Sequence, residues 1–361
     1  MSVPDLPRWL EKLDAMLDPA HLAATRELQR RCFAFEPVDH LPTVVHYPVP
    51  PDEWPTFSFL EIFEDRDKLL LNELAAVYAG AKLKDDRLYG IRANYGTGII
   101  ASLFGCPIHT FDHALPVGKE LTPEELERVL ERGVPSPHTG LCGKALETVA
   151  WFRDTLRPYP RLAQAVGSQL LDIQGPFDNA SIIWGSSIFL ALYDEPEKAG
   201  RLMDLVVDAT LAVVREHRRL DGCPLDEQDG AWNGLGGLCV RNDSTINLSG
   251  EMYQEWVKPR DARLLAPWGG WMHWCGKAHA WWKHTLDLPR LQGINPFQGE
   301  FYHLLEMYGE CERARMPIIQ WTTPLDAPCR DRIRTGLTRM MGTSDYDCAR
   351  QTLAAVYRHE A

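Results

Sequence analysis

The sequence predicts a single α/β domain of the (β/α)8, or TIM, barrel class, preceded by an N-terminal helical extension. Strand and helix patterns alternate along most of the chain and are joined by short connections, which is typical of a parallel sheet. Their number favours a closed barrel over an open sheet. The 361 residues, 45% of them hydrophobic, can bury one large core, and no low-complexity linker divides them. We therefore treat residues 1–361 as one domain.

The first 42 residues or so are expected to form a helical cap. Two amphipathic patterns, at 6–17 and 21–35, precede the first strand candidate at 43–47. The order of these patterns predicts that the cap comes before the first strand.

A capping-box signature marks a later helix. Thr122 can cap its N-terminus, Pro123 suits the first helical position, and Glu125 can close the box, so the helix should run to about Arg132. The other elements expected are strands at 169–173, 237–240, 270–275, 291–294 and 317–321, and helices at 195–220, 251–265, 299–313 and 326–341.

Composition excludes several classes of protein. The formal net charge is -12 and no Lys/Arg cluster occurs, which argues against nucleic acid or an anionic membrane surface as a partner. No signal-peptide core or run of 18 apolar residues is present. Nine scattered cysteines are typical of free thiols in a reducing compartment. We expect a cytoplasmic protein with a small-molecule substrate, and a homodimer is compatible with the sequence.

His273 and Cys275 are the strongest candidate metal ligands. They lie two residues apart in a strand pattern that Gly276 ends, so their side chains should share one face. Polar residues at the carboxyl ends of barrel strands line the active site, and imidazole with thiolate suits Zn²⁺. Cys329, in the first turn of a helix after the strand at 318–321, is the best third candidate. The alternative is two buried thiols and a core histidine.

Other polar positions follow expected strands. Asp243, after the strand at 237–240, is the candidate catalytic acid or base and could also be the partner of a cation, although Asp243 or Ser244 could equally cap a helix. The turn at 172–180 carries Gln174, with a cap by Asp178 or Asn179 as its structural alternative. The candidate substrate-binding residues are Asn94, Gln174, Trp274, Asn295 and Gln298. No GxGxxG, GxxxxGK[ST], GxSxG or HExxH pattern occurs, which argues against nucleotide, esterase and zincin functions.

The order of several short segments resembles the uroporphyrinogen-decarboxylase-like superfamily between about residues 26 and 339. These segments are 37–42, 96–98, 103–105, 174–177, 272–276 and 293–295. The resemblance implies a (β/α)8 barrel with its site at the carboxyl ends of the strands. It also implies either a porphyrinogen decarboxylase or a zinc-dependent methyltransferase acting between corrinoids and thiols or methylated substrates.

The methyltransferase branch resembles this chain more closely. Decarboxylases carry an Arg-rich N-terminal segment, whereas residues 44–48 contain no arginine. The branch holds zinc with a His-x-Cys pair, matched by His273 and Cys275, and a distant cysteine, for which Cys329 lies near the expected place. The resemblance thus implies Zn²⁺, a corrinoid on a partner protein and methyl transfer. The alternatives are a metal-free decarboxylase or lyase of a small carboxylate, using Asp243, and a barrel that only binds a partner.

Overall fold

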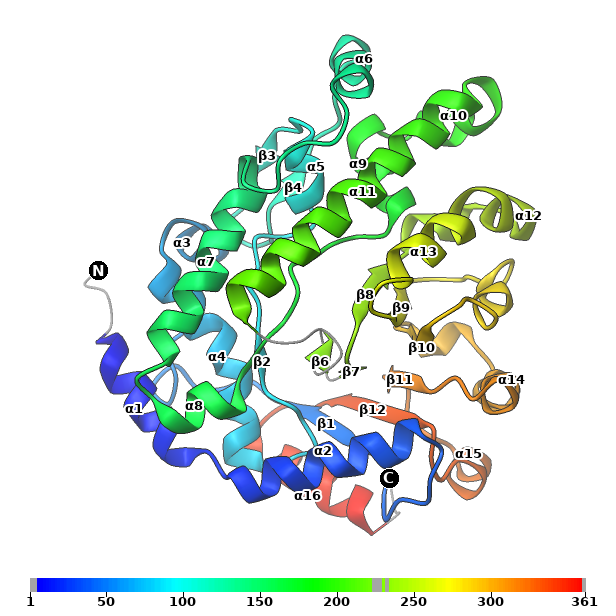
Figure 1. Cartoon of the computed structure of the whole chain (residues 1–361). Coiled ribbons are helices and arrows are strands. Elements are labelled where there is room, and N and C mark those ends of the chain that lie inside the picture. The colour runs from blue at the N-terminus through cyan, green and yellow to red at the C-terminus, as the bar shows by residue number, and fades with distance from the viewer. Residues whose placement is uncertain (1–4, 223–228, 231–233, 359–361) are drawn as a thin grey trace.

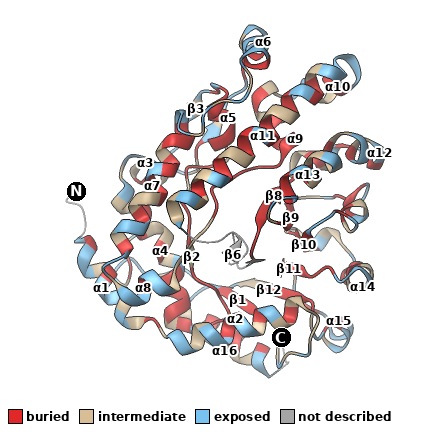
Figure 2. Cartoon of the chain, in the orientation of Figure 1, coloured by how far each residue is buried: buried red, intermediate tan, exposed pale blue. Residues whose placement is uncertain are grey.

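The computed structural model describes residues 5–222, 229–230 and 234–358. Strands surround the centre of the molecule and helices lie outside them (Figure 1). Buried residues concentrate on the strands and on the helix sides that face them (Figure 2). This arrangement places a helical layer around a parallel sheet, as the alternating sequence pattern predicts.

Six strands form one parallel sheet. In spatial order they are β1 (Thr43–His46), β12 (Leu337–Gly342), β11 (Ile318–Trp321), β10 (Leu291–Pro296), β9 (Gly270–Trp274) and β8 (Leu238–Arg241). Two short strands, β2 (Gly90–Ile91) and β5 (Gly167–Ser168), form a separate parallel pair. Among the described residues no strand ladder joins this pair to the larger sheet. The α/β class is confirmed, and a fully closed barrel stays a prediction.

The helices and minor strands complete the fold. The first half holds α1 (Leu6–Met16), α2 (Pro19–Phe33), α3 (Phe59–Glu64), α4 (Arg66–Leu83), α5 (Ile99–Leu103), α6 (Pro123–Arg132), α7 (Gly140–Leu156), α8 (Pro160–Ala165) and α9 (Pro176–Trp184). The second half holds α10 (Ile188–Asp194), α11 (Pro196–Asp221), α12 (Gly250–Met252), α13 (Lys258–Leu265), α14 (Leu304–Ala314), α15 (Ala327–Arg332) and α16 (Tyr346–Tyr357). Two antiparallel pairs are β3 (Ile108–His109) with β4 (Val117–Gly118) and β6 (Asp229–Gly230) with β7 (Gly234–Leu235).

The N-terminal helices and the capping box agree with the sequence. Helices α1 and α2 fall within the expected cap before β1. Thr122 accepts a hydrogen bond from the Glu125 backbone, and Glu125 accepts one from the Thr122 backbone. None of the helices in the described ranges is long and apolar enough to cross a bilayer.

Two predicted elements were wrong. The strand expected at 169–173 is absent, because the chain bends where Ile173 N donates to Leu171 O, 2.7 Å away. The strand that does form here is β5, which lies just before this segment. The helix expected at 326–341 ends at Arg332. Gly336 then takes a left-handed φ of +69°, and β12 fills the place between β1 and β11. Pairing between distant strands therefore overrode a local helical pattern.

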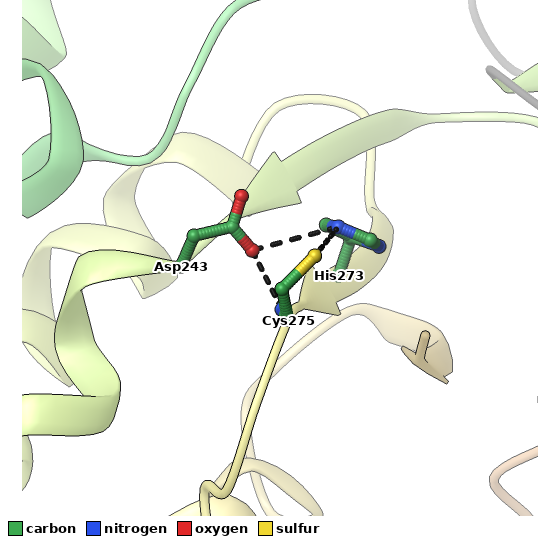
Figure 3. Close-up of side chains that lie close together, drawn as sticks. All are labelled: Asp243, His273 and Cys275. Carbon is green, nitrogen blue, oxygen red and sulfur yellow. Dashed lines mark hydrogen bonds and ion pairs between the residues drawn. The ribbon is translucent and has the colours of Figure 1, made fainter. Parts of the chain in front are cut away.

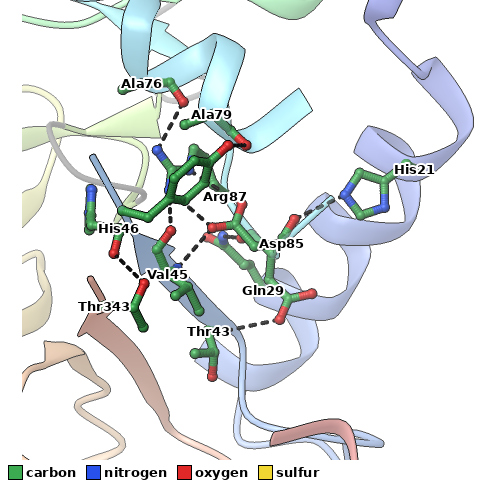
Figure 4. Close-up of polar contacts among 12 residues, drawn as sticks. His21, Gln29, Thr43, Val45, His46, Ala76, Ala79, Asp85, Arg87 and Thr343 are labelled. Carbon is green, nitrogen blue, oxygen red and sulfur yellow. Dashed lines mark hydrogen bonds and ion pairs between the residues drawn. The ribbon is translucent and has the colours of Figure 1, made fainter. Parts of the chain in front are cut away.

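Residues 85–87 make hydrogen bonds to the edge of β1 that, among the described residues, pairs with no strand (Figure 4). Asp85 accepts a hydrogen bond from Val45 N at 2.9 Å, and Arg87 donates to Val45 O at 3.0 Å. The two atoms that make these hydrogen bonds, Asp85 Oδ2 and Arg87 Nη2, also lie 3.0 Å from each other and form an ion pair. Asp86 accepts from Thr43 N at 2.9 Å. A buried ion pair thus replaces the strand ladder that this edge would otherwise need.

Replacing Asp85 with Ala is expected to lower the free energy of unfolding by about 3–5 kcal/mol, because a buried guanidinium loses its carboxylate. Urea unfolding followed by circular dichroism measures this change. Arg350→Ala is the control, because its ion pair with Asp347 is exposed and should contribute little. Equal stability losses in Asp85→Ala and Arg350→Ala would contradict the role of Asp85.

Candidate metal and substrate site

Asp243, His273 and Cys275 converge at the carboxyl ends of β8 and β9 (Figure 3). One possible ligand atom from each lies within 4.8 Å of the other two. His273 Nε2 is 3.5 Å from Cys275 Sγ and 3.5 Å from Asp243 Oδ1. Within the described ranges this is the one group of three such side chains that could hold a metal ion.

The parallel pairing of β8 with β9 creates this convergence. Arg241 lies opposite His273 in the register, and Asn242 N donates to His273 O at 2.9 Å. Past the strand ends, Cys275 N donates to Asp243 Oδ1 at 2.7 Å. The backbone of the turn after β9 therefore holds the Asp243 carboxylate, which belongs to the turn after β8.

Asn295 on β10 fixes the orientation of the His273 ring. It lies opposite His273 in the register, and its Oδ1 is 2.6 Å from His273 Nδ1. Asn295 Nδ2 donates to Ile319 O at 2.5 Å, so the amide oxygen must face the histidine as an acceptor. His273 Nδ1 therefore carries the hydrogen, and Nε2 offers its lone pair to a cation.

Electrostatics keep the imidazole and the thiol uncharged when no cation is bound. Burial lowers the pKa of His273, although the Asp243 carboxylate and Asn295 oppose this effect. Burial, together with the Asp243 carboxylate, raises the pKa of Cys275 to about 12. A neutral imidazole is ready to bind a metal, whereas the thiol needs a cation nearby to become a thiolate.

The donor set fits zinc, and so do the two ligand spacings that include His273. Bonds of roughly 2.0–2.3 Å at tetrahedral angles place neighbouring ligand atoms about 3.4–3.6 Å apart. The two 3.5 Å distances from His273 Nε2 agree with that spacing. Nitrogen, sulfur and carboxylate oxygen are all zinc ligands, and three protein ligands leave a fourth position for a substrate.

A buried polar network adjoins this group. Asp172 Oδ1 is 2.9 Å from Arg241 Nη1, and Asp172 Oδ2 is 3.4 Å from Arg92 Nη1. Gln174 donates to Asp172 at 2.5 Å, and Asn94 accepts from Arg92 at 3.2 Å. Burial would raise the pKa of Asp172, but the two guanidinium groups outweigh it and lower that pKa. The predicted residues Asn94 and Gln174 are thus brought together through Asp172.

Asp178 supports the turn that carries Asp243. It is buried in the first turn of α9, and its Oδ1 accepts a hydrogen bond from Ser244 N at 2.5 Å. Burial raises its pKa to about 7 in spite of the hydrogen bonds from Ser244. Gly175 lets this segment approach β8, since a Cβ there would lie 2.1 Å from Asn242 Oδ1. The sequence offered Asp178 only as a helix cap.

The remaining predicted residues lie elsewhere or have other contacts. Trp274 is fully buried, packs edge-on against Trp281 and donates to Tyr302, so its observed contacts are those of a core residue. Gln298 is half-buried near Gly276. Cys329 is buried in α15, and its backbone N–H donates to Asp326. The structure does not bring Cys329 into the group, in which Asp243 is the third possible ligand.

Sequence reasoning missed several residues behind the site. Arg92 follows β2 without any motif around it, and only the fold brings it to Asp172. Asp261 on α13 accepts hydrogen bonds from Asn242 and Tyr253, and burial raises its pKa to about 7. An isolated acid in an amphipathic helix gives no signal of such a role.

Comparison with known proteins gives a fold and no family. No protein-family profile and no curated protein sequence matches the chain. The structure is similar to that of a methyltransferase from Methanosarcina mazei, with a TM-score of 0.65 over 93% of this chain and 98% of that chain. The sequence identity is 14%, so the similarity shows a shared fold. The resemblance to the uroporphyrinogen-decarboxylase-like superfamily stays a prediction.

In metal-free protein we expect His273 to be the neutral Nδ1–H tautomer at pH 7, with a pKa below the ordinary value of about 6.5. Asn295→Asp should raise that pKa, because a carboxylate stabilises the imidazolium. Nitrogen-15 NMR titration of the histidines measures both effects. Gln351→Glu, on the exposed face of α16, is the matched control and should leave the titration unchanged. An Asn295→Asp titration equal to that of the wild type would refute the contact.

Proposed function

We propose that this protein is a zinc-dependent methyltransferase that moves a methyl group between a small methylated substrate or thiol and a corrinoid carried by a partner protein. The observation that carries the proposal is the group Asp243, His273 and Cys275, with zinc-like spacing at the carboxyl ends of two parallel strands. The fold shared with a methyltransferase supports it. Cytoplasmic location and a homodimer belong to the same proposal.

The protein side chains would prepare the site for a cation. Asn295 keeps His273 Nε2 free of hydrogen, and the Cys275 backbone holds Asp243 in place. Bound zinc would act as a Lewis acid that lowers the pKa of a substrate thiol or polarises the leaving atom of a methylated substrate. The carboxylate and the thiolate would together offset its two positive charges.

Residues around the metal group would orient the substrate. Asp172 holds the side chains of Arg92 and Arg241 in one arrangement, and Gln174 and Asn94 complete it. A fixed polar wall of this kind positions a small substrate at low entropic cost. We include Gln298 in that wall because it lies beside Gly276, next to Cys275.

Metal content tests the ligand assignment. Wild-type protein should bind about one zinc per chain, and Cys275→Ser should lose most of it, while Cys329→Ser should retain it. Elemental analysis of the purified protein, after zinc supplementation and dialysis, provides the measurement. Cys348→Ser is the thiol control, since that half-buried cysteine lies on α16. Zinc loss in Cys329→Ser as complete as in Cys275→Ser would return Cys329 to the third position.

Activity tests the reaction. The wild type should transfer a methyl group from methylcobalamin to a thiol, and His273→Ala should slow this transfer on the order of 10²–10³-fold, because several kcal/mol of metal assistance are lost. The absorbance of the corrinoid reports the rate. Activity that survives His273→Ala unchanged would refute the proposal. A protein without zinc whose activity on a small carboxylate depends on Asp243 would instead be the metal-free decarboxylase or lyase.

A further inference from the structure

A hollow whose lining excludes the candidate metal group lies among residues of β1, β2, β11 and β12. It is a cavity of about 90 Å³, and its lining includes Val44, His46, Gln169, Gln320 and Met340. None of Asp243, His273 and Cys275 lines it. A volume of this size holds several water-sized groups, so a small molecule can enter.

Gln320 carries two energetic penalties in this cavity. Its φ of +55° is left-handed, which is disfavoured for any residue with a Cβ and is unusual inside a strand. The register of β11 with β12 shifts at this point, between Ile318 and Trp321. Gln320 is only 2% exposed, yet its Oε1 has no hydrogen-bond partner. Glycine would avoid both penalties, so stability alone does not explain a glutamine here.

The other polar groups that line the cavity are neutral or already paired. In Figure 4 the His46 ring points away from the Asp85–Arg87 pair. His46 is exposed at the carboxyl end of β1, but the protein atoms around the ring, followed by Arg87, lower the pKa of the imidazole below its ordinary value. The ring is therefore uncharged at pH 7. The Arg87 guanidinium is bound by Asp85 and by the Val45 and Ala76 carbonyls. A charged ligand would therefore lose its hydration without meeting an unpaired countercharge.

We propose that this cavity binds a small neutral molecule that carries both hydrogen-bond donors and acceptors, such as a hydroxy amide or a diol. The Gln320 amide and the His46 imidazole each combine donor and acceptor capacity, and they would contact its polar groups. Val44 and Met340 would contact its carbon atoms. The inference does not depend on zinc or on methyl transfer.

The test compares lactamide with lactate, which have similar shapes and differ in charge. Isothermal titration or ligand-detected NMR on the full chain should show millimolar binding of lactamide and at least tenfold weaker binding of lactate. Gln320→Gly should raise the Tm, because the strain is relieved, and should weaken lactamide binding at least tenfold. His46→Ala should also weaken it.

Arg290→Gly is the matched control for strain relief. Arg290 also has a left-handed φ, +63°, but it is exposed and does not line the cavity. This variant should raise the Tm and leave lactamide binding unchanged. Gln320→Asn keeps an amide on a residue type that tolerates this φ. This variant should fold, and it should bind lactamide more weakly than the wild type does.

Three results would overturn the proposal. The first is that lactamide, acetamide and 1,2-propanediol all fail to bind, or that ordered water alone fills the cavity in a crystal soaked with lactamide. The second is equal binding of lactate and lactamide. The third is a Gln320→Gly variant with unchanged affinity or a lowered Tm, which would make Gln320 a packing residue. Zinc content is measured separately, so failure here is distinguishable from failure of the methyltransferase proposal.

Discussion

The parallel register of three neighbouring strands determines the geometry of the candidate site. It sets Arg241 on β8, His273 on β9 and Asn295 on β10 side by side in one row. A slip of one residue in β9 would turn His273 to the opposite face of the sheet and separate it from Asn295. The lone pair of Nε2, the position of Cys275 and the contact with Asp243 all follow from this row. The geometry of the candidate metal group is thus a consequence of strand pairing.

The sequence revealed those parts of the site that depend on local spacing. His273 and Cys275 were recognisable because two residues in a strand share a face, and the structure brings them within 3.5 Å of each other. The sequence predicted a chemical role for Asp243, but the position of its carboxylate beside His273 and Cys275 depends on how the turn after β8 folds. Cys329 was chosen because it follows a strand in the first turn of a helix, and that local context does not report how far its side chain lies from His273 and Cys275 in space.

As with the site, the parts of the fold that depend on local sequence patterns were the parts that could be predicted. Alternating patterns indicated the α/β class and five of the six strands of the larger sheet, whereas the segment that forms β12 has helical periodicity and was assigned to a helix. Its strand conformation arises because β1 and β11 leave a place between them. The sequence also could not predict the buried group of Asp172, Arg92 and Arg241, because each residue comes from a separate strand region. Burying such charges is costly unless each finds its partner, so the network also restricts the chain to one arrangement.

The pairing of β1 with β12 has a consequence for how the chain acquires its structure during synthesis. Thr43 and Arg339, which face each other in this pair, are about 300 residues apart. At a translation rate of 5–20 residues per second, β1 leaves the ribosome roughly 15–60 s before its partner exists. During that interval Asp85 and Arg87 are already available to occupy one edge of β1, which leaves a single edge exposed to other nascent chains. The side-chain cap therefore limits the aggregation hazard of a strand that must wait for its neighbour.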